Sequence, residues 1–251
     1  MSLAFSKFAH SLTVETAFSV LAVARNLKAQ GKDVVELEIG DSPFPSTAAA
    51  KLQGIAAIQQ DQSHYCPSPG LPAFREAAAE FVQSEFRIPA KAANVIVGPG
   101  AKVFEQFFCE AFLNPGDGVL VFSPYFPTYL PNILRRAARP VLSALKQSNG
   151  FRPEIGEIEK FLQEDPSPKA IFLNSPHNPT GGVMTADDNK AIADLLRGQN
   201  IAIFSDEPYC HMVWGGRHES ILAQPGMMEQ SVAAYTSVSY THLTLPTKRI
   251  V

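Results

Sequence analysis

Residues 172–185 read FLNSPHNPTGGVMT, and this stretch indicates the fold. An apolar run passes directly into two asparagines, two prolines, a histidine and two glycines, and a helix start follows. A loop that only connects two elements needs some of these residues, but not this density of rigid backbone beside hydrogen-bonding side chains. We therefore predict a strand, a helix and, between them, a loop that holds a cofactor.

The sequence on both sides repeats this strand-then-helix pattern. From residue 94 onward, short apolar runs typical of strands alternate with longer amphipathic stretches. Such alternation is expected of βαβ units, and it predicts an α/β fold with a mainly parallel sheet flanked by helices. The predicted strands are NVIV (94–97), GVLVF (118–122), KAIFL (169–173), NIAIF (200–204) and SVAAYT (231–236).

Three stretches predict helices. Residues 185–198 place Thr185 as a cap, Asp188 in the capping-box position and Gly198 at the end. Residues 71–86 place Pro72 in a first turn, and their apolar residues recur on one face. These apolar residues are Phe74, Ala78, Phe81, Val82 and Phe86. Residues 18–31 predict an early helix that leads to a proline-rich turn.

Polar and glycine residues follow the predicted strands. The segments are Gly98-Pro99-Gly100, Ser123-Pro124-Tyr125-Phe126, Asn174 with the loop after it, and Asp206-Glu207. In open parallel α/β sheets, the ligand crevice lies beyond the carboxyl ends of the strands. We therefore expect these four segments to converge.

The first two segments each allow two interpretations. Glycines that open directly into a helix present backbone N–H groups to an anion, but they also suit a plain strand-to-helix turn. Val103 stands where a dinucleotide fingerprint has its third glycine, so a single phosphate fits better than a pyrophosphate. The aromatic residues Tyr125, Phe126 and Tyr129 either pack in the core or offer a stacking face to a flat cofactor.

The other two segments are similarly open. Asn178 either shapes the turn or donates a hydrogen bond to a ligand. Asp206 either caps a helix or holds a proton on a heteroaromatic nitrogen, as the acidic partner of a pyridinium ring does. His177 and His211 are not at metal-ligand spacing with any cysteine, so we expect no metal site. The serines after the strands lack the G-x-S-x-G pattern of a hydrolase nucleophile.

Composition excludes several classes of function. The chain has 251 residues, 45% hydrophobic residues and a formal charge of -3, with no basic run to contact nucleic acid. The apolar run at residues 17–24 is too short to span a membrane. Three cysteines lie far apart without CxxC spacing, and this favours a reducing cytoplasm.

Five motifs, in this order along the chain, resemble the class I/II aminotransferases, which are fold-type I pyridoxal phosphate enzymes. The motifs are HYCPSPGLPAFREA, IVGPGAK, SPYFPTY, NSPHNPTGGVMT and SDEPYCHMVW. The resemblance runs from LEIGDSPFP, at residues 37–45, to residue 237. It implies pyridoxal 5'-phosphate as the cofactor, an amino acid and a 2-oxo acid as substrates, and a homodimer. A carbon–sulfur β-lyase on the same scaffold remains an alternative.

The resemblance also implies a role for particular residues. Gly100, Ala101 and Lys102 would receive the phosphate, and the ring would stack on Phe126. The phenolic oxygen would accept hydrogen bonds from Asn178 and Tyr209. Asp206 would pair with the pyridinium nitrogen. Tyr65 would reach the phosphate of the neighbouring subunit, Ser237 would also bind the cofactor, and Gly40 would lie near the substrate carboxylate.

The sequence departs from the family near its end. The family's Schiff-base lysine follows a pattern similar to S-x-S-K, but SVSY at residues 237–240 places Tyr240 there. Lys248 comes eight residues later, too far for a displaced lysine. We expect residues 238–251 to be a non-native tail, residues 1–45 to form an arm, and residues 46–237 to form an incomplete cofactor-binding domain. The other hypothesis is a short native protein that binds the cofactor without catalysis.

Overall fold

The computed structural model of the chain describes residues 3–12, 16–37, 39–40 and 45–236. The chain divides into two compact units, Met1–Pro43 and Phe44–Val251. The first unit contains helices α1 (Lys7–Ser11) and α2 (Thr16–Ala29), and α2 corresponds to the early helix predicted from the sequence. No helix of the described residues is both long and apolar enough to cross a membrane.

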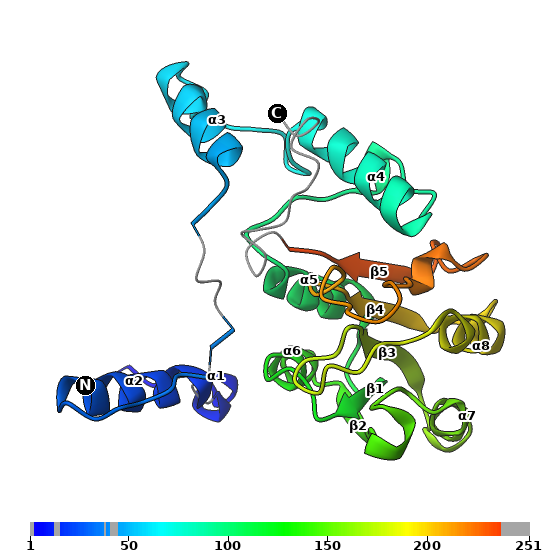
Figure 1. Cartoon of the computed structure of the whole chain (residues 1–251). Helices are drawn as coiled ribbons and strands as arrows, with labels where there is room; N and C mark the ends of the chain where they lie inside the picture. Colours follow the sequence, from blue (N-terminus) through cyan, green and yellow to red (C-terminus); the bar gives the residue numbers. More distant parts are fainter. Residues whose placement is uncertain (1–2, 13–15, 38, 41–44, 237–251) are drawn as a thin grey trace. The chain divides into compact units, whose positions relative to one another are not determined.

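The second unit is built on a parallel sheet of five strands in the order β2-β1-β3-β4-β5 (Figure 1). The strands are β1 (Gly118–Ser123), β2 (Arg139–Ala144), β3 (Pro168–Asn174), β4 (Ala202–Asp206) and β5 (Ser231–Ala234). Helices α6 (Tyr129–Arg135), α7 (Ile155–Glu164) and α8 (Ala186–Leu196) connect the first four strands in sequence. This arrangement confirms the predicted α/β fold with a parallel sheet.

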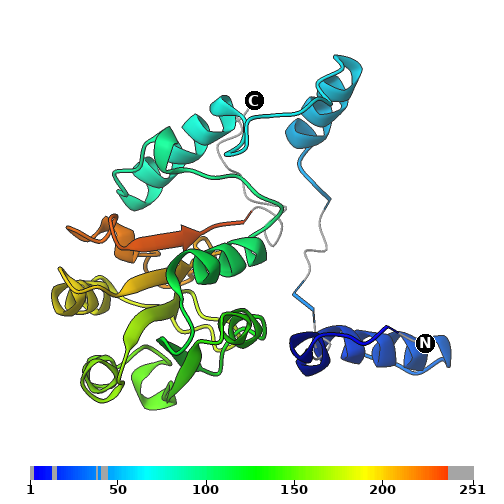
Figure 2. The same ribbon diagram turned by 180° about the vertical axis from the view of Figure 1, so that it is seen from behind.

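Helices cover both faces of the sheet. Successive side chains of a strand point to opposite faces, so each strand contributes apolar residues to both cores. Ile171 and Ile203 pack in one cluster with residues of α7 and α8, whereas Phe172 and Phe204 pack in another with α5 (Lys102–Phe112) and α6. Figure 2 shows α5 and α6 on one side of the sheet and α7 and α8 on the other. Buried strands with apolar residues on both faces explain the continuous apolar runs in the sequence.

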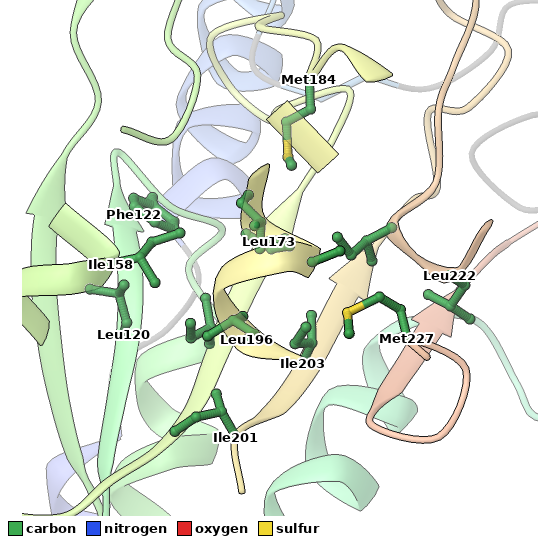
Figure 3. Packing of buried hydrophobic residues seen from close by; sticks show 14 of the residues in the cluster. Leu120, Phe122, Ile158, Leu173, Met184, Leu196, Ile201, Ile203, Leu222 and Met227 are labelled. Atoms are coloured by element: carbon green, nitrogen blue, oxygen red, sulfur yellow. The ribbon is translucent and has the colours of Figure 1, made fainter. Parts of the chain in front are cut away.

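The core on the α7 and α8 face joins residues that are far apart in the chain. Figure 3 shows Leu120 from β1, Ile158 from α7, Leu196 from α8 and Ile203 from β4 packed together. Each of these side chains is at most 1% exposed. Burying one such side chain contributes about 1.5–3 kcal/mol, so this cluster holds the helices against the sheet.

The two helices with clear start signals form as predicted. In α8, Thr185 and Asp188 make both hydrogen bonds of the capping box, and Gly198 has a positive φ of 78° after the helix ends. Helix α4 (Pro72–Phe86) has Pro72 in its first turn. Its buried residues are Ala79, Val82 and Phe86, whereas Phe74 on the predicted stripe is 46% exposed. The predicted face is therefore only partly covered.

The predicted sheet differs from the observed sheet in two places. Residues 94–97 were expected to form a strand, but Ala92–Asn94 is a turn of 3-10 helix, and Val95 to Val97 pair with no strand of the described part of the chain. Their backbone is satisfied in another way, because Val97 donates to the Pro69 carbonyl and Arg75 donates to the Val95 carbonyl. Strand β2 was not predicted. Its residues RPVLSA contain a proline, which is tolerated because β2 lies at an edge of the sheet.

The opposite edge of the sheet, at β5, borders an apolar cavity of about 380 Å³. Side chains of α4, of the segment after the 3-10 turn and of β5 line it, among them Phe81, Val82, Val95 and Val232. Helix α3 (Ala48–Gln59) has no buried residue among those described.

Candidate active site

The loop that follows β3 is fixed to the end of β4 by Asn174. In the sheet register, Asn174 lies opposite Asp206. Its amide nitrogen donates to the Asp206 carbonyl at 2.8 Å, and its amide oxygen accepts from the backbone N–H of Asn178 at 2.7 Å. Because one side chain bonds both segments, Asn178 is held at the carboxyl edge of the sheet.

Asn178 and Tyr209 form a hydrogen-bonded pair at this edge. The amide nitrogen of Asn178 donates to the Tyr209 hydroxyl oxygen at 3.0 Å. Burial raises the pKa of Tyr209, so the phenol keeps its proton at neutral pH. The two groups therefore present an N–H and an O–H donor side by side, which suits an anionic oxygen of a ligand.

Close backbone packing holds the rest of the loop. His177 is buried, its Nδ1 lies 2.7 Å from the Thr180 hydroxyl, and its backbone N–H donates to the Gly182 carbonyl at 2.8 Å. A Cβ atom on Gly182 would lie 2.7 Å from two carbonyl oxygens, so only glycine fits. These contacts give His177 a structural part in the loop. The described residues contain no group of three or more possible metal ligands.

Asp206 is a buried acid on the α5 and α6 face of the sheet. It is 6% exposed and lies two residues after Phe204, which shares that face. The Tyr129 hydroxyl of α6 donates to Asp206 Oδ2 at 2.5 Å. Burial raises the pKa of Asp206 to about 7, although the Tyr129 hydrogen bond opposes the rise. The Asp206 carboxyl group therefore titrates near neutral pH.

The start of α5 lies beside the aromatic segment. Gly100 has a φ of 87° with open space around its Cβ direction, and among the described residues no side-chain cap is recorded for the helix at Ala101. The ammonium group of Lys102 lies 4.9 Å from the centre of the Phe126 ring. An uncapped helix start presents backbone N–H groups and a positive dipole end, and here it adjoins an aromatic face.

A second buried acid, Glu207, faces the opposite side of the sheet. It accepts hydrogen bonds from Ser205, Ser220, His218 and Tyr235 at 2.6–2.7 Å. Burial alone would raise the pKa of Glu207, but these hydrogen bonds outweigh burial and lower it. The network ties the end of β4 to the residue after β5 and supports the segment that carries Asp206. The sequence offered no signal for it beyond the acid itself.

These groups fit pyridoxal 5'-phosphate. The cofactor has a phosphate, a flat ring, an anionic phenolic oxygen and a basic ring nitrogen. The uncapped start of α5, the ring of Phe126, the donors of Asn178 and Tyr209, and the Asp206 carboxylate match these four features in kind.

The cofactor roles of these residues stay predictions, as do the roles of four further positions. Tyr65 has a fully exposed side chain in the segment between α3 and α4. Gly40 belongs to the first unit, and its expected role near the substrate carboxylate stays a prediction. Ser237 and Tyr240 lie outside the described residues.

Comparisons with known proteins agree on one family. The pattern of the family described as aminotransferase class I and II matches residues 32–241. A probable aspartate/prephenate aminotransferase from Aquifex aeolicus is 34% identical over 210 residues, which are 84% of this chain and 52% of that protein. An arginine–pyruvate transaminase from Pseudomonas aeruginosa is 30% identical over 213 residues, 85% of this chain and 53% of that protein.

A solved structure also matches the fold. The aspartate aminotransferase from Thermus thermophilus with maleate superposes with a TM-score of 0.87 and 28% identity, and the match covers 94% of this chain and 61% of that one. The chain spans about half the length of the curated relatives it matches. Class I and II aminotransferases use pyridoxal 5'-phosphate, for which the groups described above provide partners. With a match over residues 32–241, the chain belongs to the class I and II aminotransferase family.

Proposed function

We propose that the protein is a pyridoxal-phosphate-dependent amino-acid aminotransferase, which moves an amino group between an amino acid and a 2-oxo acid. The observation that carries this proposal is the buried Asp206 carboxylate at the end of β4, in the same unit as the Asn178–Tyr209 pair and the uncapped start of α5. The names of the relatives support it, since they are aminotransferases of aspartate, prephenate or arginine.

Each residue of the site has a role in holding the cofactor. Backbone N–H groups of Ala101 and Lys102 would bind the phosphate, where the helix dipole favours an anion. Gly100, whose own N–H donates to the Gly98 carbonyl at 2.9 Å, would let the phosphate approach the backbone. Phe126 would stack on the ring of the cofactor. When bound, the cofactor supplies an electron-poor ring that accepts the electron pair of the substrate carbon after its proton is removed.

The polar side chains control charge on that ring. Asn178 and Tyr209 donate to the phenolic oxygen. Asp206 in its ionised form holds the proton on the ring nitrogen, and the nearby positive charge of a pyridinium lowers the pKa of Asp206 below its value of about 7 in the chain alone. Asp206 would therefore keep the ring nitrogen protonated at neutral pH.

We also make proposals about position 240, the division of the chain, its oligomeric state and its compartment. We infer that Tyr240 occupies the place of the lysine that anchors the cofactor, that residues 238–251 are a non-native tail, and that residues 1–45 and 46–237 are an arm and an incomplete domain. We further infer a homodimer, in which Tyr65 reaches the partner's cofactor phosphate, and a cytoplasmic enzyme. Unpaired cysteines support a reducing compartment.

A borohydride experiment tests the proposed site. The chain and its Tyr240→Lys variant are incubated with pyridoxal 5'-phosphate, reduced with borohydride and digested, and the labelled lysine is identified by mass spectrometry. We expect stoichiometric labelling at position 240 in the variant, and no turnover of amino acids by the unsubstituted chain. Labelling spread equally over surface lysines in both proteins would contradict the proposal.

The source gene tests the reaction class. Its sequence past codon 237 should give a lysine at position 240 and an open frame, and the encoded protein should exchange amino groups between aspartate and 2-oxoglutarate. Release of pyruvate from a cysteine conjugate without amino transfer would instead identify a β-lyase.

A further inference from the structure

Glu105 is a buried acid that the cofactor contacts described above do not use. It lies in the first turn of α5, one turn beyond the proposed phosphate-binding residues, and it is 2% exposed. No lysine or arginine of the described part of the chain forms an ion pair with it. An acid buried without an ion-pair partner is unusual and suggests a specific role.

The carboxyl group of Glu105 joins α5 to α6. Thr128, the residue before α6, donates from its hydroxyl to Glu105 Oε2 at 2.5 Å, and the amide of Asn132 donates to the same oxygen at 3.3 Å. Thr128 lies between Phe126, the proposed stacking residue, and Tyr129, which holds Asp206. A single side chain therefore connects the proposed phosphate-binding turn with the aromatic segment and, through it, with the acid at the ring nitrogen.

The surroundings keep this carboxyl group neutral. Burial raises the pKa of Glu105 to about 8, and the Asp206 charge adds to the rise, whereas the hydrogen bond from Thr128 and the charge of Lys102 oppose it. The other titratable groups nearby, Tyr129 and Cys109, also have raised pKa values, so both stay neutral at neutral pH. Strand β5, which also contacts α5, has no ionisable residue.

We propose that Glu105 is a positioning residue, which in its protonated form ties the start of α5 to the aromatic segment without adding negative charge beside the cofactor phosphate. The proposal rests on the proposed function, since it assumes that a phosphate binds at this helix start. A neutral acid still accepts the hydrogen bonds of Thr128 and Asn132. An ionised one would place a negative charge in the turn that must receive an anion, and close to the Asp206 carboxylate.

The pH dependence of cofactor binding tests the proposal. Pyridoxamine 5'-phosphate is used as the probe because it forms no bond with lysines, and its Kd is measured by fluorescence at pH 7 and pH 9. We compare the chain with Glu105→Gln, which keeps the shape and cannot ionise, and with Glu110→Gln as the control, since Glu110 is an exposed acid on the same helix.

The expected result is a loss of affinity between pH 7 and pH 9 that is on the order of tenfold larger in the unsubstituted chain than in Glu105→Gln, from repulsion of like charges at an effective dielectric constant of about 20. Glu110→Gln should behave as the unsubstituted chain does. Titration of the probe itself is common to all three proteins and cancels in the comparison. Equal losses in Glu105→Gln and the unsubstituted chain would overturn the proposal.

A second measurement does not depend on the cofactor or on the variant folding. The side-chain carboxyl carbon of Glu105 is titrated by 13C NMR in the unsubstituted chain, where a midpoint near 8 is expected. A midpoint below about 5, the ordinary range of an exposed acid, would overturn the proposal. If the probe binds at neither pH while the midpoint is near 8, the proposed function fails, whereas the neutral link between α5 and α6 stands.

Discussion

Replacement of Tyr129 by phenylalanine should raise the pKa of Asp206 above its present value of about 7. The hydroxyl donates a 2.5 Å hydrogen bond to the carboxylate, and both side chains are buried. A hydrogen bond to a charged group contributes about 1.5–3 kcal/mol, and about 1.4 kcal/mol corresponds to one pKa unit. The expected rise is therefore about one to two units. The ring stays in place, so its packing against Phe172, with centroids 5.0 Å apart, is retained.

The pKa is measured by 13C NMR of protein labelled at aspartate carboxyl carbons. The Asp206 signal is identified by its absence in Asp206→Asn. Tyr125→Phe is the control, because Tyr125 lies in the same segment and no hydrogen bond joins it to Asp206. A midpoint in Tyr129→Phe that stays near 7 or falls would refute the reasoning, since the hydroxyl would then not stabilise the ionised acid.

Three further predictions concern stability. Ile203→Ala should lower the free energy of unfolding by about 2–5 kcal/mol in urea titrations, because Ile203 is fully buried, whereas Leu142→Ala at a 53% exposed position should change it by under about 1 kcal/mol. Gly182→Ala should destabilise the chain, because the added Cβ would lie 2.7 Å from two backbone oxygens, and Gly215→Ala, with open space at its Cβ, should not; equal melting temperatures would contradict this. The free energy of unfolding should also fall as the pH rises from about 4 to about 7, because the folded chain keeps the Asp206 proton that the unfolded chain releases. Asp206→Asn should remove this contribution of up to about 4 kcal/mol. An unchanged dependence of stability on pH in that variant would count against the raised pKa of Asp206.

The sequence predicted the strands with continuous apolar runs because such runs occur in strands that are buried on both faces. It failed for NVIV at residues 94–97, which are equally β-branched, because pairing depends on a neighbouring strand and not on propensity. It also missed β2, whose exposed edge position leaves a mixed composition. Local residue patterns thus predicted elements better than they predicted pairing.

The candidate site divides in the same way. Asn178 and Asp206 lie in loops and at strand ends that have their own local signals, and the structure brings both to the carboxyl edge of the sheet. The bond between Tyr129 and Asp206 joins residues 77 positions apart, and the bond between Thr128 and Glu105 joins residues 23 apart. No local pattern encodes such contacts. The hydrogen bond from Tyr129 to Asp206 and the one from Thr128 to Glu105 could therefore be found only in the folded chain.

An absorbance titration of the chain with pyridoxal 5'-phosphate tests most directly whether these residues form a cofactor site. The unsubstituted chain is compared with Asp206→Asn and with Asp187→Asn, a control acid at an exposed position in the first turn of α8. We expect saturable binding at one site in the chain and the control, and an affinity at least about tenfold weaker in Asp206→Asn, from loss of the charged partner of the ring nitrogen. Equal affinity in all three proteins, or binding that does not saturate, would contradict the assignment of Asp206 and the site built around it.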